Sequence, residues 1–374
     1  MKIIFISNAI TPHQIPLCDQ LNSLPDVSLV FIESENIDKN SLPIGWRASC
    51  DRSYVVSYFE LKKNHSLFLE MIMDADAVIY GSGDYSLIEE RLLANKLVFL
   101  YSERIYRNWR EKIKYPYHLI KFNKMYGRSK ELYLLCASAF AAKDYNSLGL
   151  FKNKTFKWGY FTKAADNDLF SDTKMSHTTI NILWCSRFIS LKHPELAVML
   201  AHRLKHDGYN FHLNMIGTGK MLEYIETLVN SYDVADVVTL LGSMSNDDVY
   251  RQMKFHDIFL FTSDQNEGWG AVTNEAMSNG CVIVGSNKIG SIPYVVKNGE
   301  NGMIFKSGNI ESLYRKVKYL IDNPEKLHQL SENGIKTIAN LWSPQNAAYS
   351  LRILINDLLD HRQSTIKDGP CSRD

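Results

Sequence analysis

The sequence lacks a surplus of either charge: its 374 residues contain 42 Lys and Arg against 41 Asp and Glu, a formal net charge of +1. A nucleic-acid-binding protein needs a basic surplus for its phosphate contacts, so the composition does not support that class. With 45% hydrophobic and 22% charged residues, the chain is expected to be folded and globular rather than disordered or fibrous. At about 100–200 residues per domain, the length predicts two domains.

A hydrophobic run long enough to span a bilayer is also absent. The longest stretch without charge, Thr337–Leu351, has 15 residues and includes a polar Ser-Pro-Gln-Asn segment, whereas a spanning helix needs about 20 apolar residues. Met1–Ser7 has no small-residue cleavage site and predicts a first strand rather than a signal peptide. The six cysteines form no CxxC pair, which predicts reduced thiols. These features together predict a cytoplasmic protein.

Short apolar runs alternate with helix-like segments along the chain. This alternation predicts an α/β fold with parallel sheets, and runs rich in Val, Ile and Leu are typical of strands buried on both faces. The expected strands are Lys2–Ser7, Val27–Ile32, Ala77–Tyr80, Val98–Tyr101, Leu132–Cys136, Ile180–Cys185, Leu213–Ile216, Val237–Leu240, Ile258–Phe261 and Val282–Val284.

The polar segment Thr162–Thr178 has no apolar period and predicts a linker. The expected domains are therefore residues 1–165 and 175–343. A last helix over 344–362 begins at Pro344 and has apolar residues at helical spacing. The end of the chain, Lys367–Asp374, contains Gly, Pro and four charges and is expected to be frayed.

Ligands of parallel α/β sheets bind outside the carboxyl ends of the strands, so the strand-to-helix junctions are the places to search. At the first junction of the second half, Arg187 follows a strand and Lys192 precedes a helix that Pro194 can open. Two cations at such an edge suit an anion. Solvated surface charge is the alternative. At the next junction, Gly217 and Gly219 can let backbone amides approach a phosphate, although a lone GxG is weak evidence and favours a plain turn.

The strongest junction is Phe259–Gly280. Gly268 and Gly270 lie in a polar loop, a helix is expected to begin near Ala271, and Glu267 and Glu275 can both face one cleft. Carboxylates accept hydrogen bonds from sugar hydroxyls, and amides at a helix start can bind a diphosphate. Considered singly, each glutamate has an ordinary surface acid as its alternative.

These residues resemble glycosyltransferase family 4, the retaining GT-B enzymes also called glycosyl transferases group 1. Glu267 and Glu275 match the E-x7-E signature of that family, and Arg187 and Lys192 match its Arg and Lys. The resemblance covers about Ile180–Leu341. It implies two Rossmann-like domains whose parallel sheets face each other across a cleft, with the nucleotide-sugar donor on the second domain, the acceptor on the first, and a last helix that crosses back.

The resemblance also implies a role for each matching residue. Arg187 and Lys192 would hold the donor diphosphate, Glu275 the ribose hydroxyls and Glu267 the hydroxyls of the transferred sugar. Amides of the loop Gly268, Gly270, Ala271 and Val272, with Gly217 and Gly219, would complete the donor contacts. The family uses no metal, and Asp74-Ala75-Asp76 precedes a strand, where it is a poor metal clamp. We therefore expect no metal and no cofactor, the donor being a UDP- or GDP-sugar.

The first half departs from the family pattern. The segment after the first strand has no Gly-rich loop, and Leu100–Arg104 has Glu103 where a His is common. His13 and Glu103 are the expected acceptor-side residues. The alternatives are a capping or solvated histidine and an ion pair of Glu103 with Arg104 or another neighbour. Further along, Tyr294 stands where the family usually has Glu.

A basic segment, residues 104–130, contains nine Lys and Arg against one Glu and is interleaved with aromatic residues. Cations near an anionic leaflet contribute about 1 kcal/mol each, and interfacial aromatics anchor the same surface. This predicts contact with a lipid-linked acceptor at the cytoplasmic membrane face. The alternative is a solvated helix whose aromatic residues pack inward.

The function predicted from these features is transfer of a sugar from a nucleotide sugar to a glycan or lipid-linked saccharide, in the synthesis of a cell-surface polysaccharide such as lipopolysaccharide, capsule or exopolysaccharide. One alternative is a glycoside hydrolase that uses the pair Glu267 and Glu275, which leaves Arg187 and Lys192 without a role. A second is a catalytically inactive sugar-nucleotide-binding protein. A dinucleotide oxidoreductase is disfavoured because no G-x-G-x-x-G follows the first strand.

Overall fold

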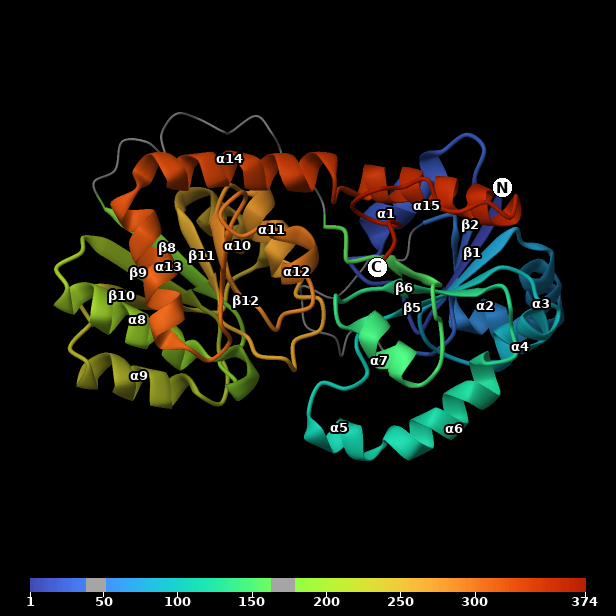
Figure 1. Ribbon diagram of the computed structural model, residues 1–374, viewed down its shortest axis with the longest axis horizontal. Coiled ribbons are helices and arrows are strands. Elements are labelled where there is room, and N and C mark those ends of the chain that lie inside the picture. The colour runs from blue at the N-terminus through green and yellow to red at the C-terminus, as the bar shows by residue number, and fades with distance from the viewer. Residues whose placement is uncertain (38–51, 163–178) are drawn as a thin grey trace. The chain divides into compact units, whose positions relative to one another are not determined.

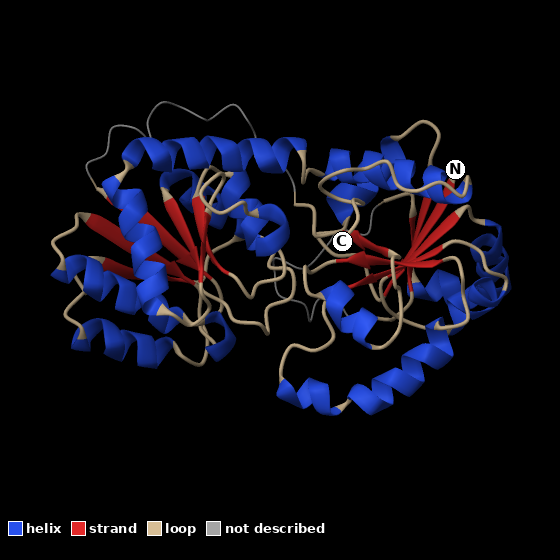
Figure 2. Cartoon of the chain, in the orientation of Figure 1, coloured by secondary structure: helices blue, strands red, loops and turns tan. Residues whose placement is uncertain are grey.

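The computed structural model describes residues 1–37, 52–162 and 179–374 (Figure 1). The chain forms two compact units, one comprising Met1–Lys163 with Leu341–Asp374 and the other Ala164–Asn340. Each unit has one sheet of parallel strands surrounded by helices (Figure 2). The predicted α/β fold with two Rossmann-like domains is confirmed. The expected linker Thr162–Thr178 lies, except for Thr162, outside the described residues, and the arrangement of the sheets about a cleft stays a prediction.

The first unit contains a seven-stranded sheet in the order β3-β2-β1-β4-β5-β6-β7. Its central strands are buried on both faces, which explains their unbroken apolar sequences. The edge strands β3 and β7 are not predicted by the sequence, because two or three residues carry too little pattern. The strands are β1 (Lys2–Ser7), β2 (Ser28–Glu33), β3 (Val55–Val56), β4 (Ala77–Tyr80), β5 (Val98–Ser102), β6 (Leu132–Cys136) and β7 (Thr155–Lys157).

Within residues 1–37 and 52–162, seven helices are interspersed with these strands. The side chain of Asn108 caps α5 by accepting a hydrogen bond from the amide of Glu111. Pro116 lies in the first turn of α6, where its missing N–H is tolerated, and separates α6 from α5. The helices are α1 (Ile15–Ser23), α2 (Tyr58–Lys63), α3 (His65–Asp74), α4 (Ser86–Leu93), α5 (Trp109–Ile113), α6 (Tyr115–Tyr126) and α7 (Ala141–Ser147).

The last helix, α15 (Pro344–Leu359), belongs to the first unit and packs against α1 (Figure 1). Ser343 caps it by accepting a hydrogen bond from the amide of Asn346 at 3.2 Å. Leu351 and Leu354 are fully buried. The apolar face that the sequence marks on this helix is therefore the face that the first unit covers.

The segment Lys367–Asp374 is ordered, so the expectation of a frayed end is wrong. The amide of Lys157 in β7 donates to the carbonyl oxygen of Ser372, and the amide of Cys371 donates to that of Lys157, each at 2.8 Å. Cys371 is fully buried. The segment thus pairs with the edge strand β7 through its backbone, which its charged, Gly- and Pro-containing sequence does not reveal.

The second unit contains a six-stranded parallel sheet in the order β10-β9-β8-β11-β12-β13. Its core includes side chains from the strands and from the helices that flank them, among them Trp184, Leu200 and Val317. The short edge strand β13 is not predicted by the sequence. The strands are β8 (Ile180–Cys185), β9 (Phe211–Ile216), β10 (Val238–Gly242), β11 (Ile258–Phe261), β12 (Val282–Ser286) and β13 (Met303–Phe305).

The helices of the second unit alternate with its strands. Pro194 begins α8, as its sequence predicts. The helices are α8 (Pro194–His206), α9 (Leu222–Ser231), α10 (Asn246–Phe255), α11 (Val272–Ser278), α12 (Ile292–Val295), α13 (Ile310–Asp322) and α14 (Pro324–Asn340). No helix within the described ranges has both the length and the apolar character to cross a bilayer. The described cysteines are all free, and Cys50 lies outside the described residues.

The strand order reverses once in each sheet. The chain runs outward from β1 to β3 and then returns to place β4 on the other side of β1; β8, β9, β10 and β11 repeat this pattern. Because the loops after the two inner strands leave in opposite directions, a crevice forms at their carboxyl ends, where ligands of open α/β sheets bind. The candidate sites are therefore expected after β1 and β4 and after β8 and β11.

Candidate functional site

The loops after β8 and β11 carry the three predicted catalytic residues. Arg187 follows β8, Lys192 ends the 3-10 turn Ser190–Lys192, and Glu267 lies between β11 and α11. The two strands are neighbours in the sheet, so their carboxyl ends meet at the same edge. Lys192 and Glu267, which are 75 positions apart in the sequence, come into direct contact there.

Lys192 and Glu267 form an ion pair between Nζ and Oε2, and each side chain is only 14% exposed. Two further bonds join their loops: Thr262 Oγ1 donates to the carbonyl oxygen of Lys192 at 2.6 Å, and the amide of Asp264 donates to that of Leu191 at 2.9 Å. A shielded cation and carboxylate are thus held side by side. Such a pair can bind an anionic group and a neighbouring hydroxyl of one ligand.

His193 links the same two loops. Its backbone is left-handed, with φ of 48°. Its Nδ1 lies 2.7 Å from Oε1 of Glu195, and its Nε2 lies 3.5 Å from Oδ2 of Asp264. Hydrogen bonds with Asp264 and Glu195 raise the pKa of this imidazole to about 9. His193 is therefore a cation at neutral pH, and it holds the turn of Lys192 against the loop of Glu267.

Arg187 is exposed, and no ion pair with its guanidinium occurs among residues 1–37, 52–162 and 179–374. Its backbone neighbours, by contrast, are fixed. The amide of Ser186 donates to the carbonyl oxygen of Ile216 at 3.0 Å, and the amide of Phe188 donates to that of Thr218 at 2.8 Å. The guanidinium can therefore bind a ligand without first breaking an internal ion pair.

Gly217 and Gly219 pack against the backbone on either side of Arg187. A Cβ atom would lie 1.9 Å from the carbonyl oxygen of Ser186 at Gly217, and 2.4 Å from that of Phe188 at Gly219. The amide of Gly217 donates to the carbonyl oxygen of Gly242 at 2.7 Å. The sequence predicts these glycines as amide donors to a phosphate, but the Gly217 amide is already used. The structural role of both glycines is to let the two junctions approach closely.

The loop before α11 is fastened at its backbone. The amide of Gly290 donates to the carbonyl oxygen of Gly268, and the amide of Ser291 donates to that of Trp269, both at 3.0 Å. The indole of Trp269 is fully buried, and its Nε1 donates to Oδ1 of Asn274 at 3.1 Å. These contacts fix the position of the amides in this loop.

Several of those amides have no acceptor among the described residues. Within the part of the chain that the structure describes, no residue accepts a hydrogen bond from the amides of Gly268, Gly270 or Ala271. Val272 is the first residue of α11. Unused amides in a fixed loop can serve as donors to an oxygen-rich ligand.

Glu275 lies on α11 and is only partly exposed. The hydroxyl of Tyr250, on α10, donates to its Oε1 at 3.2 Å. Burial raises the pKa of Glu275 to about 7, although the bond from Tyr250 acts in the opposite direction. The carboxyl thus changes its protonation near neutral pH. The pKa of Glu275 is raised because the desolvation of its carboxylate outweighs the hydrogen bond from Tyr250.

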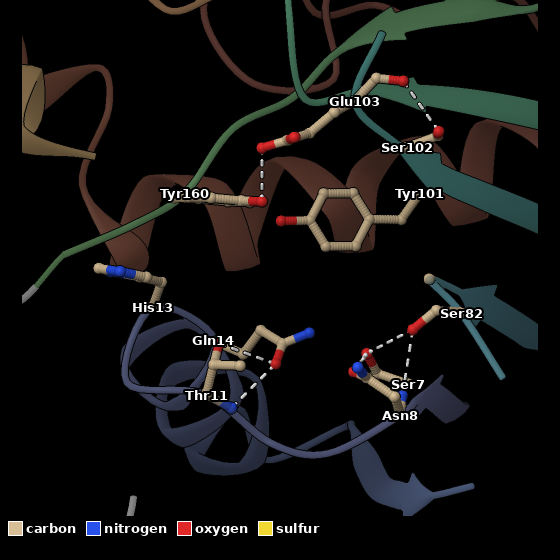
Figure 3. Close-up of a pocket in the computed structure, with 11 residues that line it drawn as sticks. Ser7, Asn8, Thr11, His13, Gln14, Ser82, Tyr101, Ser102, Glu103 and Tyr160 are labelled. Carbon is tan, nitrogen blue, oxygen red and sulfur yellow. Dashed lines mark hydrogen bonds between the residues drawn. The ribbon is translucent and has the colours of Figure 1, made fainter. Parts of the chain in front are cut away.

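The expected acceptor-side residues, His13 and Glu103, line one pocket in the first unit, with a volume of about 370 Å³ (Figure 3). The pocket lies at the switch point between β1 and β4, because its walls include the residues directly after both strands. Its lining consists of Ser7, Asn8, Thr11, His13, Gln14, Gly81, Ser82, Tyr101, Ser102, Glu103 and Tyr160.

Tyr160 connects the two expected residues. Its ring stacks on the imidazole of His13, with centroids 5.6 Å apart and planes 6° apart, and its hydroxyl donates to Oε1 of Glu103 at 2.7 Å (Figure 3). The other oxygen of Glu103 forms an ion pair with Arg107. The ion pair that the sequence leaves open as an alternative is therefore present, with Arg107 as the partner rather than Arg104.

The pocket is polar but contains no Lys or Arg in its lining. Burial lowers the pKa of His13 to about 4, so its imidazole is neutral at neutral pH. Of the residues that line the pocket, only Glu103 is charged there. Hydroxyl and amide groups, two tyrosine rings and a single carboxylate suit an uncharged, hydroxyl-rich ligand.

The basic segment forms α5 and α6, and its aromatic residues divide into two groups. Tyr106 and Tyr126 are buried, as the inward-packing alternative requires. Trp109 and Tyr117, however, are 66% and 59% exposed. The exposed members make this segment an amphipathic surface of the first unit rather than helices whose aromatic residues all pack inward.

Sequence reasoning missed three residues of these sites: Tyr160, Tyr250 and His193. Tyr160 follows the unpredicted strand β7, so nothing placed it near β1. Tyr250 lies on a helix with no motif of its own. His193 adjoins the matched Lys192, and that adjacency is the one signal that could have drawn attention to it.

The two-domain GT-B architecture is shared with solved structures. HepE of Anabaena, whose structure was solved with UDP, has a TM-score of 0.65 at 14% identity, over 96% of this chain and 99% of HepE. A glycosyltransferase from Rickettsia africae has a TM-score of 0.66 at 16% identity, over 96% of this chain and 98% of that one. At these identities the likeness shows the fold alone.

Residues 167–337, which make up most of the second unit, match the family described as Glycosyl transferases group 1. Glycosyltransferase MJ1178 of Methanocaldococcus jannaschii is 29% identical over 151 residues, 40% of this chain and 42% of that protein. The capsular polysaccharide biosynthesis glycosyltransferase CapM of Staphylococcus aureus is 30% identical over 161 residues, 41% and 39% of the two chains. The chain thus spans about two fifths of the length of these relatives. The resemblance to glycosyl transferases group 1 that the sequence shows is confirmed. Membership of glycosyltransferase family 4 stays a prediction.

Proposed function

We propose that the protein is a retaining glycosyltransferase that moves a sugar from a nucleotide-sugar donor to a glycan or lipid-linked saccharide. One observation carries this proposal: Lys192 and Glu267, which are 75 positions apart in the sequence, form an ion pair at the switch point of the second sheet, and exposed Arg187 lies on the same β8–α8 segment as Lys192. A glycoside hydrolase would use the carboxylates Glu267 and Glu275 but would leave the two cations without a role. Departure of a diphosphate gives Arg187 and Lys192 a role as well, because they can stabilise its negative charge.

The donor contacts follow from the chemistry of each group. Arg187 and Lys192 bind the diphosphate and stabilise the charge that grows on it as the sugar departs, a task for which no metal is needed. Glu267 accepts hydrogen bonds from hydroxyls of the transferred sugar, and Glu275 from those of the ribose. Amides of the loop Gly268–Val272 and the turn at Gly219 add donors. The known UDP complex of HepE is consistent with such a ligand in this fold.

The acceptor binds in the pocket of the first unit. His13 is neutral there, and Glu103, oriented by Tyr160, accepts a hydrogen bond from an acceptor or sugar hydroxyl. Retention of the anomeric configuration is the outcome implied by the family resemblance. It agrees with a pocket in which no carboxylate is placed as an isolated base, since Glu103 is engaged by Tyr160 and Arg107.

The biological role proposed is the synthesis of a cell-surface polysaccharide. The names of two relatives support it: CapM of S. aureus is a capsular polysaccharide biosynthesis enzyme, and AmsK of Erwinia amylovora is an amylovoran biosynthesis enzyme. The fold is also similar to that of the lipopolysaccharide outer core galactosyltransferase WaaB, with a TM-score of 0.63 at 16% identity over 91% of this chain and 98% of WaaB.

A cytoplasmic location with contact to an anionic membrane surface completes the proposal. The basic segment of residues 104–130 exposes Trp109 and Tyr117 among its cations. A lipid-linked acceptor would be reached from that surface. Reduced cysteines in the described chain are consistent with this location.

A panel of UDP-, GDP- and other activated sugars tests the proposal. The matching donor should raise the melting temperature of the protein and be hydrolysed slowly without an acceptor, and Arg187→Ala should abolish both effects. A sugar-nucleotide-binding protein without catalysis would give stabilisation without hydrolysis. A glycoside hydrolase would instead cleave aryl glycosides and ignore every nucleotide sugar, and that result would overturn the proposal.

A further inference from the structure

A groove lies between α4 and α6 in the first unit, and α6 belongs to the basic segment of residues 104–130. Its volume is about 370 Å³. Lys121 and Lys124 of α6 and Arg128 beyond it line one wall, while Leu92, Leu93 and Met125 contribute apolar surface. We call it the α4–α6 groove. It thus combines cations and apolar atoms in a single concave surface.

The three cations of the groove are available to a ligand. No residue in the described ranges forms an ion pair with Lys121, Lys124 or Arg128. Glu89 also lines the groove, so the balance is three cations against one carboxylate. The hydroxyl oxygen of Ser129 is shielded from solvent and, within the described chain, has no hydrogen-bond partner. The groove therefore offers a surplus of positive charge to an anion.

An exposed apolar stripe continues from the groove along α6. Tyr117 and Ile120 are 59% and 73% exposed. At 3.6 residues per turn, positions 117, 121 and 124 lie on one face of α6, with 120 beside them, and Arg128 follows two residues after the end of the helix. The apolar stripe and the lysines of the groove therefore face the same way. Figure 1 shows α5 and α6 at the periphery of the first unit.

From these observations we infer that the α4–α6 groove binds the phosphate of an anionic phospholipid while Tyr117 and Ile120 enter the same bilayer. The inference rests on the proposed membrane contact and gives it a specific site. A soluble anion would use the cations but leave the apolar stripe exposed. A bilayer satisfies both, because phosphates and acyl chains occur at adjacent depths in it.

Vesicle flotation with matched variants of the full chain tests the site. K121Q/K124Q/R128Q removes the cations of the groove, and R110Q/K112Q/K114Q removes three cations of the same segment that do not line it. On phosphatidylcholine vesicles containing phosphatidylglycerol, the first variant should lose at least about ten-fold in partitioning, on the scale of three surface cations. The second should lose clearly less. Equal losses would mean that charge acts diffusely, and the inference would fall.

Two further arms identify the ligand. Replacing phosphatidylglycerol by oleate at equal surface charge should weaken binding of the wild type but leave K121Q/K124Q/R128Q unchanged, because the inferred site binds the lipid phosphate, which oleate lacks. Inorganic phosphate in the low millimolar range should release no more protein than chloride at the same ionic strength. Selective release by phosphate would assign the groove to a free anion and overturn the lipid site. Stabilisation of the wild type by a nucleotide sugar, measured separately, shows whether the proposed enzyme activity stands when vesicle binding fails.

Discussion

The imidazole of His193 lies 3.5 Å from the carboxylate of Asp264, and this contact joins the turn that carries Lys192 to the loop that carries Glu267. The other imidazole nitrogen lies 2.7 Å from Glu195. Two carboxylates on one ring favour its protonated form. The geometry of the candidate donor site therefore depends on the charge of a residue that does not itself belong to the family motif.

We expect His193→Gln to destabilise the protein in a pH-dependent way. The pKa of His193 is raised from 6.5 to about 9 by its bonds with Asp264 and Glu195. Stability from a raised imidazole pKa is fully present below pH 6.5 and is lost as the pH rises through 9. Urea unfolding should show a deficit of about 1–3 kcal/mol at pH 6 that largely disappears by pH 10.

His206→Gln is the matched control for this prediction, since His206 lies 2.9 Å from Asp207 but is 79% exposed. It should have no measurable effect at either pH, because exposed pairs contribute little. A deficit of His193→Gln that is the same at pH 6 and pH 10 would show that the ring acts through packing and not through its charge.

Glu275→Gln should stabilise the protein and weaken its hold on the nucleotide. Burial raises the pKa of Glu275 from 4.5 to about 7, so ionisation in the folded state costs free energy that accumulates between these pH values. Above pH 7 the variant should therefore be more stable than the wild type by about 1–3 kcal/mol. At acid pH the two should be equal.

Nucleotide affinity of Glu275→Gln is measured by calorimetry with the nucleoside diphosphate of the matching donor. A lower affinity is expected, since a neutral amide is a weaker acceptor for ribose hydroxyls than a carboxylate. Tyr250→Phe, which removes the bond to Glu275 without removing the carboxylate, serves as the comparison and should change affinity less. An unaltered dissociation constant in Glu275→Gln would refute the ribose assignment.

The sequence predicts the α/β fold and ten of the strands because buried parallel strands have continuous apolar runs, as in Ile180–Cys185 and Val282–Ser286. It misses β3, β7 and β13, where two or three residues pair through their backbone at a sheet edge. The ordered end at Cys371 is missed for the same reason: its hydrogen bonds to Lys157 are between backbone groups. Backbone pairing leaves no trace in side-chain pattern.

The candidate donor site is predictable in its residues but not in its contacts. The motif places Lys192 and Glu267 in the same region, yet it cannot show that they pair with each other. At Gly217 the sequence predicts a contact that the structure does not leave available: the amide expected to bind a phosphate donates to the carbonyl oxygen of Gly242 instead. In the first unit His13 and Glu103 are predicted, whereas Tyr160, which orients both, follows the unpredicted strand β7.

Glu267→Ala should lower turnover by about 10²–10³, the scale of one preorganised transition-state contact. It also leaves Lys192 without its partner in a site where both side chains are 14% exposed, so some loss of stability is expected as well. Arg187→Ala should lower turnover to the same extent with no change in unfolding, because Arg187 is exposed. Turnover is measured with the donor found in the panel.

A double-mutant cycle separates the two effects of Glu267. Lys192→Met combined with Glu267→Gln should recover the stability lost in the single variants, because the pair is then replaced by neutral groups. Turnover should not recover. Wild-type turnover in Glu267→Ala would remove that residue from the proposed mechanism, and additive losses of stability would show that the ion pair is energetically unimportant.

Gly219→Ala should destabilise the second unit and displace Arg187. The new Cβ would lie 2.4 Å from the carbonyl oxygen of Phe188, so the junction that holds Arg187 must move. A loss of about 2–4 kcal/mol in the free energy of unfolding is expected for a backbone clash of this kind. Donor affinity should fall as well.

Gly208→Ala is the control: Gly208 also has a positive φ, 79°, but nothing lies within 4 Å of the added atom. Its cost should stay near the roughly 1–2 kcal/mol of a left-handed backbone alone, with donor affinity unchanged. If the two variants were equally stable and bound the donor equally well, close packing at Gly219 could not be what positions Arg187.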